Sequence, residues 1–263
     1  MIRRIGVLIV IVTIAAAIVG PLIVPMSATS QDLPQRLVGP MWGHPLGLDE
    51  LGRDVLARLL AGARISLLVG LFVVSISAVV GTLVGSIAGY AGGWIDEVIG
   101  RVMDVLLAFP GILLAIALVA VLGPSLTNVV IALASIGWVG YARLVRGQVL
   151  KIRELEYVQA ARALGATAPR VLLRHVIPAT LSPVIVQATL GMASAIIAEA
   201  SLSFLGLGVQ PPTPSWGTML DAGRSHLLDA PHLTLFPGLA IALLVLGFNL
   251  SGELLRDRLD PRT

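Results

Sequence analysis

Six apolar stretches, each long enough to cross a lipid bilayer as a helix, constrain the fold of this chain more than any other feature. They cover residues 5–26, 66–90, 101–122, 128–150, 181–204 and 233–255. The hydrocarbon core of a bilayer is roughly 30 Å thick and takes about 20 helical residues to cross. The polar segments between the stretches are too short to fold separately. We therefore predict an all-α membrane protein with six transmembrane helices in a single domain over residues 1–263.

The composition is that of a membrane protein and excludes several kinds of chemistry. Hydrophobic residues make up 56% of the chain and charged residues 13%, against roughly a quarter charged in soluble domains. There is no cysteine, which excludes disulfides, cysteine metal ligands and thiol nucleophiles. The first stretch follows Arg3 and Arg4 as in a signal peptide, but it is longer than the roughly 7–15 apolar residues usual there. We expect it to remain as a span.

Basic residues fall mainly on one side of this topology. Of the 18 lysines and arginines, 13 lie on the side that holds both termini and the segment after the fourth stretch, and 5 lie on the other. Basic residues are retained on the cytoplasmic side of a membrane. We therefore expect cytoplasmic N- and C-termini, a cytoplasmic loop over about 151–180, and extracytoplasmic loops over about 27–65 and 206–232.

The first extracytoplasmic loop ends in a segment of amphipathic character. Asp49 is a suitable N-cap for a helix, and Asp54 and Arg58 have the spacing of an i, i+4 ion pair. The apolar side of this helix would consist of Leu56, Leu59, Leu60 and Ala63. We predict a separate amphipathic helix that lies in the membrane interface before the second span.

The second extracytoplasmic loop is rich in turn residues. Its Trp216 is suited to the membrane interface. All four histidines lie outside the spans, and His226 and His232 are six residues apart, which is not the spacing of metal ligands on a helix. We predict no metal site.

Polar residues inside the predicted spans are candidates for function. Such groups are costly in lipid and usually face the interior of a bundle or a water-filled path. The candidates are Asp104, Gln187, Glu199 and Asn249. Two interpretations remain open for them, namely hydrogen bonding between helices and the lining of a path. In the second stretch, glycines at every fourth position should let another helix approach closely; they are Gly81, Gly85 and Gly89.

The segment between the fourth and fifth stretches is the longest internal one that cannot lie in lipid. An apolar stripe at helical spacing predicts a short helix within it; the stripe is Tyr157, Ala160, Ala161 and Leu164. Gly165 fits the left-handed position that ends a helix, and Thr167 is a suitable N-cap for a second helix over 168–175. The alanines beside Gly165 leave a low surface that a partner can approach closely.

This segment resembles the EAA loop in the membrane subunits of binding-protein-dependent ABC importers. The likeness consists of Gln159-Ala160-Ala161, three residues, Gly165, nine residues, and His175-Val176-Ile177-Pro178. Gln159 and His175 stand where that family usually has glutamate and isoleucine. In the family, the loop is a coupling helix that docks on the cytoplasmic ATPase. The implied ATPase-coupling site is Glu156, Gln159, Ala160, Ala161, Gly165 and Pro178.

Other stretches resemble the shorter permease of prokaryotic dipeptide or oligopeptide ABC importers. They read H-P-L-G-L-D-E-L-G-R-D-V-L from His44 and A-E-A-S-L-S-F-L-G-L-G-V-Q-P-P-T-P-S-W-G from Ala198. The resemblance implies the type I ABC importer architecture and a multi-pass position in the cytoplasmic membrane. The implied partners are a second homologous permease, two ATPase subunits and an extracytoplasmic binding protein that rests on loop 206–232. Glu199 would then meet the charged amino group of a passing peptide.

The sequence argues against an ATPase site in the chain itself. A P-loop requires Gly-Lys-Ser/Thr, and the only lysine, Lys151, follows Leu150. We expect no catalytic residue and no cofactor here, with ATP and magnesium bound by partner ATPases, and no nucleic-acid partner. Three alternatives remain open. A nickel or glutathione importer shares the same permease architecture, a secondary transporter needs no ATPase, and a membrane scaffold transports nothing.

Overall fold

The computed structural model describes residues 2–24 and 26–259 of the 263-residue chain. The described residues form ten α-helices and no β-strand. The helices are α1 (Ile2–Ile23), α2 (Val55–Ala91), α3 (Gly93–Leu107), α4 (Gly111–Leu122), α5 (Leu126–Ile152), α6 (Glu156–Ala163), α7 (Ala168–Val171), α8 (Ile177–Phe204), α9 (Trp216–Gly223) and α10 (His232–Leu259).

The helices account for the apolar stretches of the sequence. Five helical runs among the described residues are long and apolar enough to cross a membrane, namely α1, α2, α5, α10 and the run 168–204 that ends in α8. α3 and α4 make a sixth span when counted together, but they are bent by 85°. Pro110 at the break has no N–H to donate and disfavours a helical Phe109. The prediction of an all-α membrane protein with six spans is confirmed in this form, with a sharply broken third span.

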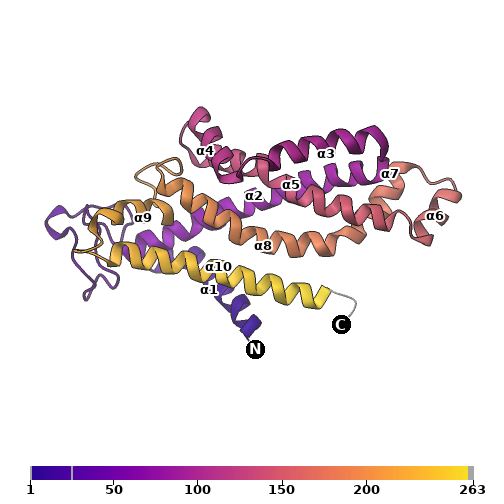
Figure 1. The fold of residues 1–263 in the computed structure, drawn as a ribbon. Helices are drawn as coiled ribbons and strands as arrows, with labels where there is room; N and C mark the ends of the chain where they lie inside the picture. The colour runs from indigo at the N-terminus through magenta and orange to yellow at the C-terminus, as the bar shows by residue number, and fades with distance from the viewer. Residues whose placement is uncertain (1, 25, 260–263) are drawn as a thin grey trace.

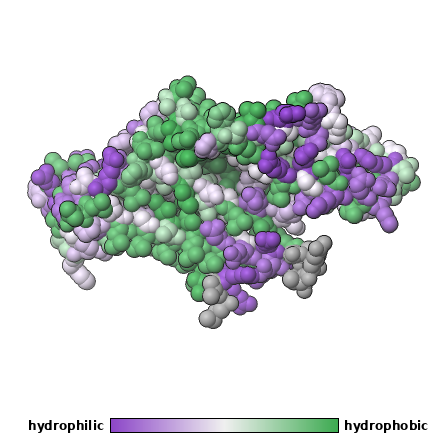
Figure 2. Space-filling model, viewed as in Figure 1, coloured by the Kyte–Doolittle hydropathy of each residue, from purple (hydrophilic) through white to green (hydrophobic). Residues whose placement is uncertain are grey.

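The long helices run side by side as a bundle (Figure 1). α2 packs along α5 and α8, and α10 packs against α1 and α8. α6 and α7 lie at one end of the bundle, and α9 lies at the other (Figure 1). Apolar residues cover the middle of the face in Figure 2, and hydrophilic residues gather toward the α6 end. This distribution suits a bilayer around the middle of the bundle.

The start of α1 and the end of α10 lie together. Near the start of α1, Arg3 forms ion pairs with Glu253 and Asp257, near the end of α10. The even number of spans between them brings the two termini to the same end of the bundle, as the predicted topology requires.

α2 is longer than a bilayer requires, and it absorbs the amphipathic segment before the second span. Its 37 residues extend about 55 Å at 1.5 Å each, against a hydrocarbon core of roughly 30 Å. The helix starts after Asp54, whose carboxylate accepts a hydrogen bond from the Ala57 N–H. The prediction of a separate interfacial helix is therefore wrong. Residues 55–65 contain no proline and only one glycine, and most of the others are good helix formers. Helical hydrogen bonding therefore continues through them into the span.

The sequence predicted Asp49 as a helix N-cap, and this prediction is wrong. The Asp49 carboxylate accepts the Arg53 N–H and forms ion pairs with the side chains of Arg53, at 2.7 Å, and Arg58, at 3.3 Å. The Asp54 carboxylate caps α2 and lies 2.8 Å from Nδ1 of the His44 ring. The predicted Asp54–Arg58 pair is therefore wrong, because Arg58 reaches back to the loop instead of along its own helix.

Trp216 is inside the protein and not at the membrane interface. It begins α9, is 2% exposed, and donates its indole N–H to the Leu59 carbonyl of α2 at 2.9 Å. Ser215 caps α9 by accepting the Thr218 N–H. The loop between α8 and α10 is therefore folded against α2, and the interfacial role predicted for Trp216 is wrong. A buried tryptophan with a satisfied N–H packs more favourably than an exposed one.

The glycines of α2 let α5 approach closely, as predicted. A Cβ atom at Gly81 would lie 2.5 Å from the Trp138 carbonyl oxygen, and one at Gly89 would lie 2.9 Å from Val149 Cβ. At Gly85 it would overlap the Ala142 carbonyl. Backbone contact of this kind is a main source of helix association in lipid.

We expect Gly85→Ala to lower the free energy of unfolding by about 1–3 kcal/mol, because the added methyl group forces α2 and α5 apart. Gly100→Ala is the matched control, since a Cβ at this helical glycine of α3 would meet nothing within 4 Å. It should leave stability unchanged or raise it by up to about 1 kcal/mol. Thermal unfolding in detergent measures both, and equal effects would contradict the packing argument.

Candidate functional site

α6 is a two-turn helix held to the bundle on one side. Val158 is fully buried in the main apolar core. After the helix, Gly165 has a φ of +84°, the Gly165 N–H donates to the Arg162 carbonyl, and the Ala166 N–H donates to the Ala161 carbonyl. This pair of bonds is a Schellman motif, which satisfies the last carbonyls of a helix. The prediction that Gly165 ends the helix is confirmed.

The opposite side of α6 is apolar and exposed. Tyr157 is 47% exposed and Leu164 is 88% exposed, and Ala160 between them is exposed as well. These three residues, here called the exposed face of α6, belong to the predicted apolar stripe, so the stripe points away from this chain's own core. Beside it, the Gln159 amide donates to the Glu154 carbonyl at 3.2 Å. An apolar face at the end of a bundle is a surface that a partner can cover.

Two arginines connect this segment to the end of α2. Arg153 donates to the Gly89 carbonyl at 2.8 Å. Arg162, on α6, donates to the Tyr90 hydroxyl at 3.0 Å, and its guanidinium carbon lies 4.6 Å from the centre of the Tyr90 ring. A cation over an aromatic ring adds attraction to the hydrogen bond. A displacement of α6 would therefore pull directly on α2.

Through Tyr157, α6 also contacts the segment that leads into the fifth span. The rings of Tyr157 and His175 lie 6.3 Å apart. His175 belongs to a π-helical turn, Leu172–Val176, that joins α7 to α8. Pro178 has no N–H to donate and follows this turn, in the first turn of α8. The predicted helix over 168–175 is therefore part of a continuous run to residue 204, and the polar loop is shorter than 151–180.

A hollow of about 290 Å³ lies among α2, α4, α5 and α8. Its wall is largely apolar, with Val73, Val74 and Ile136 among the lining residues. The surface is recessed and mostly green over these helices in Figure 2. A mostly apolar concavity with a few polar groups is the usual form of a small-molecule site.

The structure places the four polar residues of the spans in different surroundings. Gln187 lines the hollow. Glu199 is fully buried elsewhere between helices, Asp104 forms an ion pair with Arg143 of α5 at 2.8 Å, and Asn249 is exposed on α10. Sequence reasoning missed three further polar lining residues of the hollow, which are Ser77, Tyr141 and Ser194.

Glu199 joins α8 to α2 through hydroxyl groups. Its carboxylate accepts hydrogen bonds from Ser66 of α2 at 3.0 Å and from Ser203 at 2.7 Å. We expect Glu199→Leu to lower the free energy of unfolding by about 1–3 kcal/mol, because both buried hydroxyls lose their acceptor. Glu199→Gln keeps a carbonyl acceptor in a side chain of the same shape. Its loss of unfolding free energy should be less than half of the loss in Glu199→Leu. Thermal unfolding in detergent checks the stability, and loss of transport by a fully stable Glu199→Gln protein would favour a place in the path instead.

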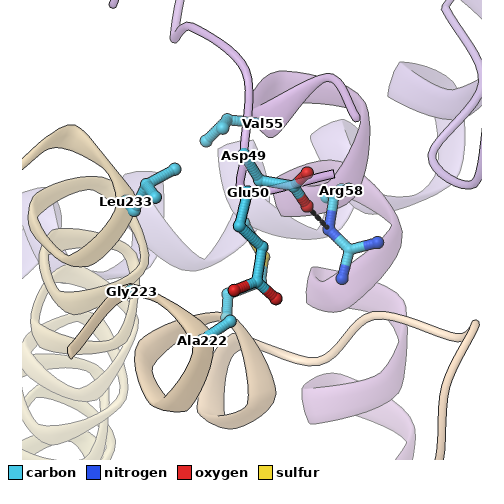
Figure 3. A pocket seen from close by; sticks show the side chains of 8 residues that line it. Asp49, Glu50, Val55, Arg58, Ala222, Gly223 and Leu233 are labelled. Carbon is cyan, nitrogen blue, oxygen red and sulfur yellow. Dashed lines mark ion pairs between the residues drawn. The ribbon is translucent and has the colours of Figure 1, made fainter. Parts of the chain in front are cut away.

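At the far end of the bundle, a cavity of about 10 Å³ lies beside the Asp49–Arg58 ion pair (Figure 3). Asp49 and Glu50 line it from the loop before α2, and Ala222 and Gly223 line it from α9 (Figure 3). This volume holds about one water molecule. The cavity is therefore too small for a substrate, and its ion pair fixes the loop to α2.

Comparison with known proteins shows similarity along nearly the whole chain. Residues 81–263 match a family model described as "Binding-protein-dependent transport system inner membrane component". The glutathione transport system permease protein GsiD of Shigella dysenteriae serotype 1 is 52% identical over 97% of this chain and 84% of that protein. The dipeptide transport system permease protein DppC of Alkalihalophilus pseudofirmus is 48% identical over 98% and 85%. The similarity to these two permeases extends over the α6 region and all four helices around the hollow.

Proposed function

The chain belongs to the family of inner membrane components of binding-protein-dependent transport systems, and from this we propose that it is a permease subunit of an ATP-driven importer of di- or oligopeptides. The observation that carries the proposal is the similarity to permeases named for dipeptide and for glutathione transport. Dipeptides and glutathione are both short molecules whose amino acids are joined by amide bonds.

In the proposed complex, this chain lies in the prokaryotic cytoplasmic membrane and pairs with a second, homologous permease. Two ATPase subunits bind ATP and magnesium, and this chain contributes no site of its own for hydrolysis. The α6 end and both termini face the cytoplasm, in agreement with the distribution of basic residues. A binding protein delivers substrate at the opposite end, near loop 206–232.

The exposed face of α6 is the proposed contact with an ATPase subunit. Glu156, Gln159, Ala160, Ala161, Gly165 and Pro178 form the coupling site around it. Closure of the ATPases on ATP moves α6, and the bundle changes from an inward-facing to an outward-facing state. ATP drives this change only if its contacts differ between the two states. The link from Arg162 of α6 to Tyr90 of α2 supports this route, because α2 also lines the hollow.

Uptake in source cells tests the proposal. Cells with and without the gene, and cells with the gene restored, are given labelled dipeptide, longer peptide, glutathione and nickel. We expect loss of peptide or glutathione uptake that returns on restoration and stops on ATP depletion. Loss of nickel uptake alone would overturn the substrate, uptake that survives ATP depletion would indicate a secondary transporter, and unchanged uptake of every compound would favour a scaffold.

A further inference from the structure

The polar groups of the hollow are all electrically neutral. Among the described residues that line it there is no charged side chain. Its polar side chains come from three helices and are Ser77, Tyr141, Gln187 and Ser194. Hydroxyl and carboxamide groups both donate and accept hydrogen bonds. The hollow therefore offers hydrogen bonds without a net charge.

Ser77 is the most informative of these groups. Its side chain is 1% exposed, and its hydroxyl has no hydrogen-bond partner within the described part of the chain. Four other hydroxyls in the spans donate to the carbonyl four residues earlier, whereas Ser86 is the one further buried hydroxyl of the described residues without a partner; the four are Ser135, Thr189, Ser201 and Ser251. A buried hydroxyl without a partner is rare and calls for an explanation.

Two glycines leave the space that the hydroxyl groups of Ser77 and Tyr141 fill. A Cβ atom at Gly137 would lie 2.5 Å from Ser77 Oγ, and one at Gly191 would lie 2.5 Å from the Tyr141 hydroxyl. The Tyr141 hydroxyl makes a long hydrogen bond, 3.5 Å, to the Gln187 carbonyl. Any larger residue at either glycine would displace a hydroxyl, so the local backbone is fitted to these two groups.

We propose that the hollow is a subsite of the translocation path that binds the uncharged amide groups of a passing peptide. This inference rests on the proposed function. A backbone amide presents one donor and one acceptor, which the hydroxyls and the Gln187 carboxamide match. A charged terminus or side chain would lose water there without meeting an opposite charge, and a bare divalent cation would meet no anionic ligand.

The charged groups predicted for the path have other partners. Glu199 is held by two serine hydroxyls, and Asp104 is paired with Arg143. This chain therefore recognises the feature that all peptides share and leaves selection by charge to other subunits. The similarity to permeases named for both dipeptide and glutathione transport agrees with a subsite of this kind.

The test uses the complete transporter in proteoliposomes with three single variants, Ser77→Ala, Tyr141→Phe and Gln187→Ala. The control is Ser86→Ala, because Ser86 is on the same helix, equally buried and also without a partner, but lies outside the hollow. Three labelled dipeptides of neutral, basic and acidic side chains are compared. The readouts are uptake and ATP hydrolysis.

Each variant of a residue that lines the hollow should lower uptake per ATP hydrolysed by about three- to tenfold. This is the fold-change that corresponds to the loss of one hydrogen bond. The loss should be equal for the three dipeptides, and Ser86→Ala should match the unmodified protein. Variants that all behave like Ser86→Ala, or a loss confined to one charge class, would overturn the subsite. If the unmodified complex takes up no peptide at all, the proposed function fails, which is a separate result.

Discussion

Replacement of Gly165 with leucine is expected to lower ATP-driven uptake about tenfold or more while the protein still inserts normally. Gly165 has a φ of +84°, and a Cβ atom there would meet nothing within 4 Å in this chain. The leucine side chain would therefore project into the space beside the exposed face of α6, where the ATPase is proposed to dock. Overpacking of a fitted contact costs about 1–3 kcal/mol, which corresponds to the expected loss. Uptake and ATP hydrolysis by the reconstituted complex measure it.

Gly123→Leu is the matched control for this substitution. Gly123 follows α4 with a φ of +92°, and a Cβ atom there would also meet nothing within 4 Å. With a ψ of 154°, Gly123 has a backbone conformation that is essentially reserved for glycine, so its substitution imposes backbone strain of about 1–3 kcal/mol without touching α6. We expect near-normal uptake. Equal losses in both variants would assign the effect to strain, and normal uptake by Gly165→Leu would remove Gly165 from the coupling site.

Arg162→Gln is expected to separate ATP hydrolysis from transport. The substitution removes the attraction to the Tyr90 ring and weakens the tie between α6 and α2. Movement of α6 would then reach α2 less completely, so uptake per ATP hydrolysed should fall about three- to tenfold while hydrolysis continues. The ratio of uptake to hydrolysis in proteoliposomes is the measurement.

A graded series at Tyr90 distinguishes this link from a general loss of charge. Tyr90→Phe removes the hydroxyl but keeps the ring under the guanidinium, so its effect should be smaller than that of Tyr90→Leu. Arg101→Gln removes a basic residue whose ion pair with Glu97 is highly exposed, and it should have little effect. A ratio that falls equally in Arg101→Gln and Arg162→Gln would contradict the link.

Features that depend on local sequence could be predicted. The length of the apolar stretches indicated the spans, the glycines of α2 indicated close packing, and Gly165 indicated the end of α6. Each of these follows from residues close together in the chain. The sequence could not predict the 85° angle between α3 and α4, because a proline permits a break without setting its angle.

Features that depend on distant contacts were missed. Trp216 is well suited to a membrane interface by type, but its hydrogen bond to Leu59 joins residues 157 positions apart. Arg162 and Tyr90 are 72 positions apart, so their contact had no local signal. Glu199 stood out because a carboxylate in lipid is costly, whereas Ser77 and Tyr141 did not, because hydroxyls are common in spans.

Cross-linking from α6 is the measurement that most directly tests the central claim that α6 docks on the ATPase. The chain contains no cysteine, so Ala160→Cys introduces a single thiol on the exposed face of α6, to which a photoreactive cross-linker is attached. Ser225→Cys places the same group on an exposed residue beside α9, at the other end of the bundle. We expect an adduct with the ATPase subunit from Ala160→Cys and none from Ser225→Cys. An adduct from Ser225→Cys alone, or no adduct from Ala160→Cys in an assembled complex, would contradict it.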